Sequence, residues 1–176
     1  MNTKTTVIEQ DQLEEQFAFC DKIAAIWQTC GRTPTAYVET YGCQQNEADS
    51  EKLRGYLAQS GYRIAGSAEG ADVVVMNTCS IREHAEQRVF GNLGALTHTK
   101  RRHPEQKIFL CGCMAGETKV SDRIKKSFPY VDGVFSTHHL WQFPEILYNV
   151  LTKKKRQFYI EDEAGSIAEG IPQVRD

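Results

Sequence analysis

The sequence predicts an α/β fold with a doubly wound, mainly parallel sheet that is flanked by helices. Short apolar runs of the kind found in buried strands alternate with longer segments of helical period over most of the chain. Each connection between successive runs is long enough to contain a helix, which parallel strands require. The expected topology is therefore of the flavodoxin or Rossmann kind.

Four strand, loop and helix units account for this pattern. The run Asp72–Met76 is apolar almost throughout, as expected of a strand buried on both faces. Ser80 and Glu83 after it have the spacing of a capping box, which indicates a helix start. The predicted strands are 36–40, 72–76, 107–110 and 133–135, and the predicted helices are 46–59, 80 to about 100, 113 to about 126, and 140–151.

The segments on either side of these units differ from them. Residues 3–29 carry a helical stripe of apolar side chains, which Gly31 ends, so we expect residues 1–33 to be a leading helical extension. Residues 34–152 form the predicted main domain. The basic run Lys153–Arg156 is followed by residues without a helical or strand period, so residues 153–176 are interpreted as a linker toward a further domain.

Bulk composition excludes some classes of protein. With 176 residues and a formal charge of -2, the chain has no general attraction for nucleic acid or membranes. No apolar stretch approaches the roughly 20 residues of a membrane helix, and the polar amino terminus lacks the apolar core of a secretory signal. We therefore expect a cytoplasmic protein with reduced cysteines and no membrane partner.

Three cysteines occupy the same structural place in the pattern. Cys43, Cys79 and Cys113 each lie just past the carboxyl end of a predicted strand and at the start of a helix. The carboxyl ends of parallel strands share one edge of the sheet, so the three thiols are expected to converge there. A helix amino terminus favours the thiolate that binds metal. Cys20, Cys30 and Cys111 are interpreted as packing residues.

The chemistry of three thiolates suits an iron-sulfur cluster. Three ligands leave one iron with an open coordination position, whereas structural zinc prefers four closed ligands. A zinc- or nucleotide-binding module with a flavodoxin-like fold stays as an alternative, although no G-x-G-x-x-G order supports a nucleotide site. A regulatory interaction domain based on the run Lys153–Arg156 is a third possibility.

Three local segments are specific enough to indicate a family. Thr40–Glu51, Asn77–Gly94 and Cys111–Ala115 closely resemble the amino-terminal domain of the radical S-adenosylmethionine methylthiotransferases, and the likeness extends over Thr35–Val150. The resemblance implies that Cys43, Cys79 and Cys113 hold an auxiliary 4Fe-4S cluster. It also implies a complete enzyme with a second 4Fe-4S cluster, S-adenosylmethionine, a radical domain and an RNA-binding domain.

Within that family, Gln44 and the segment Arg82–His84 favour the branch that adds a methylthio group to carbon 2 of isopentenyladenosine beside the tRNA anticodon. The alternatives are the branches that act on threonylcarbamoyl-adenosine in tRNA or on a ribosomal protein. No C-x-x-x-C-x-x-C spacing occurs among the six cysteines, so this 176-residue chain alone is not expected to be active. The residues expected around the cluster ligands are Gly42, Gln44, Asn46, Asn77, Thr78, Ser80 and Arg82.

Overall fold

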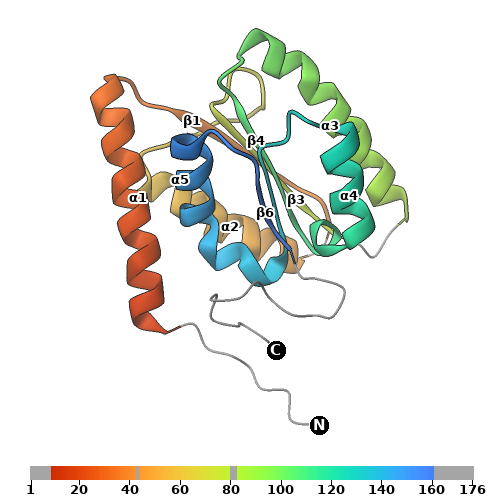
Figure 1. Ribbon diagram of the computed structural model, residues 1–176, viewed down its shortest axis with the longest axis horizontal. Coiled ribbons are helices and arrows are strands. Elements are labelled where there is room, and N and C mark those ends of the chain that lie inside the picture. Colours follow the sequence, from red (N-terminus) through yellow and green to blue (C-terminus); the bar gives the residue numbers. More distant parts are fainter. Residues whose placement is uncertain (1–8, 43, 80–82, 161–176) are drawn as a thin grey trace.

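A six-stranded parallel sheet forms the centre of the molecule in the computed structural model, which describes residues 9–42, 44–79 and 83–160 (Figure 1). The strand order is β2-β1-β3-β4-β5-β6, and every neighbouring pair is parallel. This order confirms the predicted doubly wound fold. The strands are β1 (Thr35–Thr40), β2 (Arg63–Ile64), β3 (Val73–Thr78), β4 (Lys107–Gly112), β5 (Gly133–Phe135) and β6 (Gln157–Tyr159).

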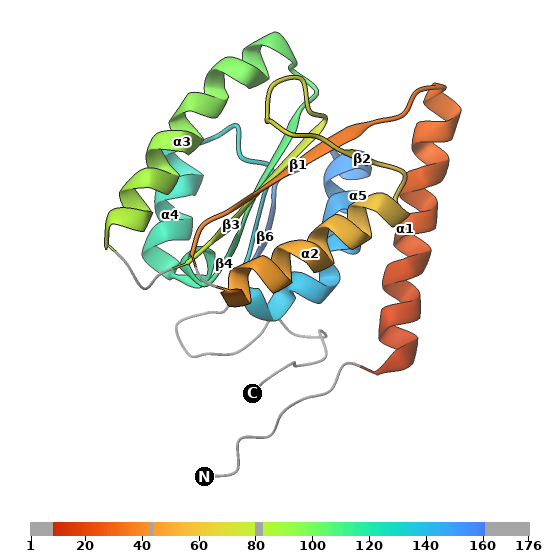
Figure 2. The same cartoon turned by 180° about the vertical axis from the view of Figure 1, so that it is seen from behind.

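Helices cover both faces of the sheet, and the two views in Figures 1 and 2 show them as separate layers. Helices α2 (Gln44–Gln59) and α5 (Phe143–Lys153) lie on one face, with α1 (Gln10–Cys30) packed on their outer side. Helices α3 (Glu83–Arg102) and α4 (Thr118–Ser127) lie on the other face. None of the described helices is long and apolar enough to cross a membrane.

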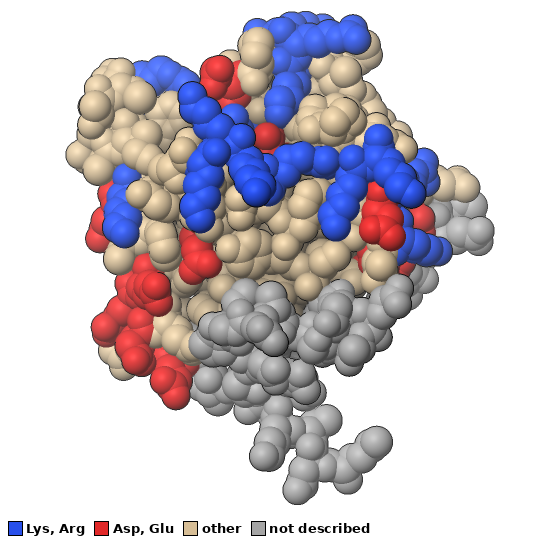
Figure 3. Space-filling model, viewed as in Figure 1, with Lys and Arg blue, Asp and Glu red and all other residues tan. Residues whose placement is uncertain are grey.

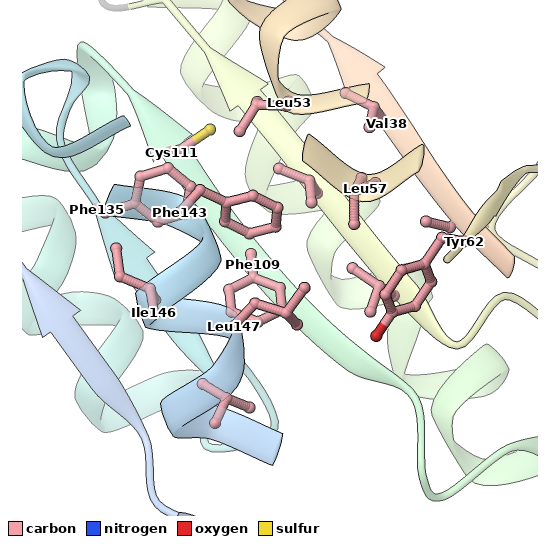
Figure 4. Packing of buried hydrophobic residues seen from close by; sticks show 14 of the residues in the cluster. Val38, Leu53, Leu57, Tyr62, Phe109, Cys111, Phe135, Phe143, Ile146 and Leu147 are labelled. Carbon is pink, nitrogen blue, oxygen red and sulfur yellow. The ribbon is translucent and has the colours of Figure 1, made fainter. Parts of the chain in front are cut away.

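Two apolar cores, one on each face, hold these layers together. All six residues of β3 are buried, and alternate side chains enter opposite cores: Val73 and Val75 pack under α2 and α5, while Val74 and Met76 pack under α3. Figure 4 shows the first core, in which Phe109 and Phe143 meet edge to face. Each fully buried valine or phenylalanine side chain contributes about 1.5–3 kcal/mol, which explains why β3 has no polar residue before its end.

The amino-terminal helix belongs to this packed structure. Its left-handed end at Gly31, where φ is 75°, matches the predicted stop. Cys20 and Ile23 are fully buried beneath it, and the Trp27 ring lies edge to face against Tyr62 with a hydrogen bond from Trp27 Nε1 to the Tyr62 hydroxyl at 3.0 Å. The helix therefore covers the layer formed by α2 and α5.

Two strands were not predicted. Gln157–Tyr159, which we assigned to the linker, forms β6 at the edge of the sheet beside β5. The assignment was wrong because three residues are too few to show a period, and this strand is held by its pairing and by the packing of Phe158 and Tyr159 on opposite cores. The strand β2 has only two residues, Arg63 and Ile64, and both are exposed, so it is too short to show an alternating pattern.

Two helices also begin later than predicted. A 3-10 turn, η1 (Met114–Gly116), precedes α4, and another, η2 (Thr137–Gln142), precedes α5. Each turn carries the chain from the end of its strand to the helix that covers the sheet. Ser80, the predicted cap of α3, lies outside the described residues.

The basic run at the end of α5 has in part a structural role. Lysines and arginines form a band across the face seen in Figure 3, while acidic residues gather near the beginning of α1. Arg156 in this run donates hydrogen bonds to the carbonyl oxygens of Ile124, Lys125, Phe128 and Val131, at 2.8 to 3.2 Å. It thereby closes the carboxyl end of α4, which accounts for one of the charges without any partner molecule.

Candidate metal centre

The register of the sheet places the ends of four strands in one row. Thr40 of β1 pairs with Asn77 of β3, Asn77 pairs with Cys111 of β4, and Cys111 pairs with Phe135 of β5. Cys79 and Cys113 each follow this row by two residues, and Cys43 follows it by three. The loops that carry the three predicted ligands therefore leave the sheet at the same edge and at the same height.

Gly42 shows how closely the first of these loops approaches the second. Its φ is 123°, and a Cβ atom built on it would stand 2.6 Å from Cβ of Cys79 and 2.7 Å from Oδ1 of Asn46. No side chain fits at such distances. The residue directly before Cys43 is thus in contact with Cys79, and only glycine permits this approach.

Gly112 makes the corresponding contact from the third loop. Its φ is 99°, and a Cβ atom on it would stand 2.3 Å from the carbonyl oxygen of Thr78. Gly112 directly precedes Cys113, and Thr78 directly precedes Cys79. The end of β3 is therefore enclosed between the neighbours of the other two cysteines, which forms a cradle that any added side chain would fill.

A buried network of hydrogen-bonded polar side chains between α2 and the end of β3 stabilises the cradle. Asn77 Nδ2 donates to the carbonyl oxygen of Asn46 at 2.8 Å and to Ser50 Oγ at 3.0 Å, and Asn46 Nδ2 donates to the carbonyl oxygen of Thr78 at 2.8 Å. The Ser50 hydroxyl also lies 2.7 Å from Thr40 Oγ1. These bonds join the first turns of α2 to the end of β3. Because the site is buried, breaking any of these bonds would leave an unsatisfied polar group, so they hold α2 firmly against β3.

The cysteines themselves fall into exposed and buried groups. Cys79 is buried, with 6% of its surface exposed, and Cys113 is exposed. Cys43 lies outside the described residues. Within the part of the chain that the structure describes, no three His, Cys, Asp or Glu side chains gather as a metal site. None of the five described cysteines forms a disulfide, as predicted for these five.

The other three cysteines partly match their interpretation as packing residues. Cys20 and Cys111 are fully buried, and Figure 4 shows the Cys111 sulfur beside Leu53 and the phenylalanine rings. Burial raises the pKa of the Cys111 thiol well above its ordinary value, with a further contribution from the charge of Asp49. Cys30 is exposed at the end of α1, so its interpretation as a packing residue was wrong.

Of the seven residues predicted to surround the ligands, some are buried at the site, one is exposed, and two lie outside the described residues. Asn46, Asn77 and Thr78 are buried and bonded at the site, and Gly42 lines it. Gln44 is exposed at the start of α2. Ser80 and Arg82 lie outside the described residues.

Sequence reasoning missed two polar side chains near the site. Ser50 could have been found, because Asn46 and Ser50 extend the helical stripe of Leu53 and Leu57 toward the site at spacings of three and four residues. Thr137, whose hydroxyl lies 3.7 Å from the Cys113 sulfur, had no such signal.

The fold and this edge define a doubly wound α/β domain that presents cysteines at the carboxyl ends of its strands. Residues 35–136, more than half of the chain, match the model of a family described as "Uncharacterized protein family UPF0004". The chain belongs to this family.

Curated relatives extend the match. The chain is 43% identical over 145 residues to a tRNA-2-methylthio-N(6)-dimethylallyladenosine synthase of Caldicellulosiruptor saccharolyticus. The aligned region covers 82% of this chain and 31% of the relative. A protein of the same name from Clostridium beijerinckii is 46% identical over 77% of this chain and 30% of the relative. Another from Clostridioides difficile is 35% identical over 98% of this chain and 37% of the relative. The chain thus spans about a third of the length of these relatives.

Proposed function

We propose that this chain is the domain of a tRNA methylthiotransferase that holds an auxiliary 4Fe-4S cluster through Cys43, Cys79 and Cys113. The observation that carries the proposal is the cradle formed by Gly42, Gly112 and the end of β3, which brings the neighbours of all three cysteines into contact. A cubane with three protein thiolates fits this donor set. When bound, it supplies an iron with an open position for a sulfur ligand.

The residues of this chain would prepare the site before any metal arrives. The bonds from Asn77 and Asn46 hold the start of α2 against the end of β3, which fixes the backbone directly before Cys79. Burial of Cys79 limits water at one side of the site, while exposure of Cys113 leaves another side open. A substrate would approach from that open side.

The relatives' names support a specific reaction for the complete enzyme. We propose that it converts N6-dimethylallyladenosine in tRNA to its 2-methylthio derivative, and the shared name of the relatives favours that branch over the threonylcarbamoyl-adenosine and ribosomal-protein branches. S-adenosylmethionine and a second 4Fe-4S cluster would bind to a radical domain outside these 176 residues, which contain no C-x-x-x-C-x-x-C loop. The tRNA would be bound by an RNA-binding domain of the same polypeptide. A tRNA substrate would place the enzyme in the cytoplasm.

Anaerobic reconstitution tests the cluster. The chain is incubated with ferrous iron and sulfide, desalted, and assayed for both elements and for the broad visible absorption of a 4Fe-4S cluster. We expect about four irons and four sulfides per chain. Cys79→Ser and Cys113→Ser should each lose most of this iron, whereas Cys30→Ser, which changes an exposed cysteine on α1, should retain it.

Zinc is the competing occupant, and the same preparation distinguishes it. A parallel incubation with zinc alone should give less than one tightly held ion per chain, because only three thiolates are available and structural zinc prefers four ligands. Stoichiometric zinc that survives a chelator, with no iron retained, would refute the iron-sulfur assignment. Mass spectrometry of tRNA from cells that carry or lack the complete gene would test the reaction separately.

A further inference from the structure

The fourth strand of the row ends in a loop without a cysteine. Phe135 of β5 pairs with Cys111, so β5 reaches the same height as β3 and β4. Thr137 follows Phe135 by two residues, as Cys79 follows Asn77 and Cys113 follows Cys111. The register therefore gives Thr137 in the fourth loop the position that cysteines hold in the second and third.

Two contacts join this fourth loop to the loop of Cys113. The Thr137 hydroxyl oxygen lies 3.7 Å from the Cys113 sulfur. Beside it, a Cβ atom built on Gly116 would stand 3.2 Å from Cβ of Ser136, so Ser136 rests against the turn that follows Cys113. The amide of Ser136 donates to the carbonyl oxygen of Tyr159 at 3.0 Å, which anchors the loop to β6. The approach of Thr137 to Cys113 is thus supported on both sides.

The chemistry of a metal-bound thiolate fixes the direction of the hydrogen bond. A cysteine that ligates iron has lost its proton and can only accept, so the Thr137 hydroxyl is the donor. A donor at a ligand sulfur stabilises negative charge on the cluster. The reduced cluster carries one more negative charge than the oxidised one, so the donor favours reduction and raises the potential.

We propose that Thr137 is a positioning residue that hydrogen-bonds the Cys113 sulfur and raises the reduction potential of the auxiliary cluster. The inference rests on the proposed function, since it needs a cluster at Cys113. The process concerned is the transfer of one electron to the oxidised cluster from a low-potential one-electron reductant, which is dithionite in the test below, with no bond made or broken in the protein.

The test compares reduction potentials of reconstituted chains. Thr137→Val replaces the hydroxyl by a methyl group of nearly equal size, Thr137→Ser retains the hydroxyl, and Thr152→Val makes the same change at an exposed site on α5. Each protein is reconstituted anaerobically, assayed for iron, and titrated with dithionite while the signal of the reduced cluster is followed by electron paramagnetic resonance. We expect a more negative midpoint for Thr137→Val, and midpoints close to that of the unmodified chain for the other two.

The outcomes separate this inference from the proposed function. If the unmodified chain binds no cluster, the proposed function fails and this inference fails with it. If all four proteins contain full iron and Thr137→Val keeps the original midpoint, the inference alone is overturned. A shift of equal size in Thr137→Ser would also overturn it, because the hydroxyl would then be irrelevant. If Thr137→Val loses its iron, Thr137→Ala is prepared as a fifth protein, and loss of iron in both variants would show a purely structural role and reject the proposal.

Discussion

Arg32 holds Asp72 through two parallel hydrogen bonds, from Nη1 to Oδ2 at 3.0 Å and from Nη2 to Oδ1 at 2.6 Å. Asp72 also accepts from the amide of Thr35 at 2.8 Å and lies 3.0 Å from His103 Nε2. This carboxylate therefore ties the segment after α1 and the end of α3 to the beginning of the neighbouring strands β1 and β3. The junction lies at the end of the sheet opposite the cysteines.

The Asp72 junction should make stability depend on acid. Burial raises the pKa of Asp72, but the bonds from Arg32, the Thr35 amide and His103 together outweigh it, so the net pKa lies below its ordinary value of 3.8. Because the folded pKa is lower than the unfolded one, the stabilisation is present above about pH 4 and is lost as the pH falls through the folded value. Urea unfolding from pH 6 to pH 3 should show a smaller loss for Asp72→Asn than for the unmodified chain.

The control for this pH dependence is Asp122→Asn. Asp122 is exposed on α4 and makes no salt bridge among the described residues. Its replacement should leave the acid dependence of the unfolding free energy intact. If the unfolding free energy of Asp72→Asn fell with decreasing pH as steeply as that of the unmodified chain, the junction would contribute nothing to acid sensitivity.

The buried amide of Asn77 should be costly to remove. In Asn77→Ala, Ser50 and the carbonyl oxygen of Asn46 each lose a donor in a site without solvent access, so we expect a loss of about 2–4 kcal/mol in the free energy of unfolding. Denaturant unfolding measures this directly. Asn149→Ala, which removes a half-buried amide and one bond of 3.4 Å, should cost less than about 1 kcal/mol. Equal losses in the two variants would contradict the network's importance.

Two glycine substitutions should have effects of opposite sign. Gly112→Ala places a Cβ atom 2.3 Å from a backbone oxygen at a φ of 99°, so it should lower stability by more than about 3 kcal/mol and lower iron retention. Gly55→Ala adds a methyl group in open space on α2 and should raise stability by about 0.5–1 kcal/mol. Thermal unfolding of both variants tests the pair. A Gly112→Ala protein as stable as the original would remove the argument for close loop contact.

Much of this architecture could be predicted because it depends on local periods. The buried run at β3 and the helical stripe of Leu53 and Leu57 are visible in the sequence, and parallel strands necessarily share a carboxyl edge. The convergence of the cysteine-bearing loops follows from that geometry, without any long-range information.

The missed features depend on contacts between distant segments. The strand β6 exists because Phe158 and Tyr159 can pack on cores built from earlier residues. The contact of Thr137 with Cys113 depends on the register of β4 and β5 and on the turn that follows each strand. Neither relation has a repeating pattern along the chain, so inspection of single segments cannot reveal it.

The guanidinium of Arg156 should not be replaceable by an ammonium group. Its planar fork reaches three carbonyl oxygens at the end of α4 and that of Val131 in the following loop, and a lysine cannot reproduce that geometry. We expect Arg156→Lys to lose about 1–3 kcal/mol of stability although the charge is retained. Lys155→Ala removes an exposed charge one residue away and should change stability by less than about 0.5 kcal/mol. If Arg156→Lys kept the full free energy of unfolding, the contribution of Arg156 to stability would come from its charge and not from its hydrogen bonds to the carbonyl oxygens.

The five described thiols should react in an order set by burial. Under anaerobic conditions at pH 8, iodoacetamide should modify Cys30 and Cys113, which are exposed, well before Cys20, Cys79 and Cys111, which are buried. Burial also raises the pKa of Cys20 and of Cys111, which reduces the thiolate fraction of both. Peptide mass spectrometry at successive times gives the order, and a guanidinium-unfolded sample should modify all five together. Prior loading with iron and sulfide should then protect Cys113 but leave Cys30 reactive, because of these two exposed cysteines only Cys113 lies at the cysteine-bearing edge. Equal protection of Cys30 would mean that iron binds without regard to that edge.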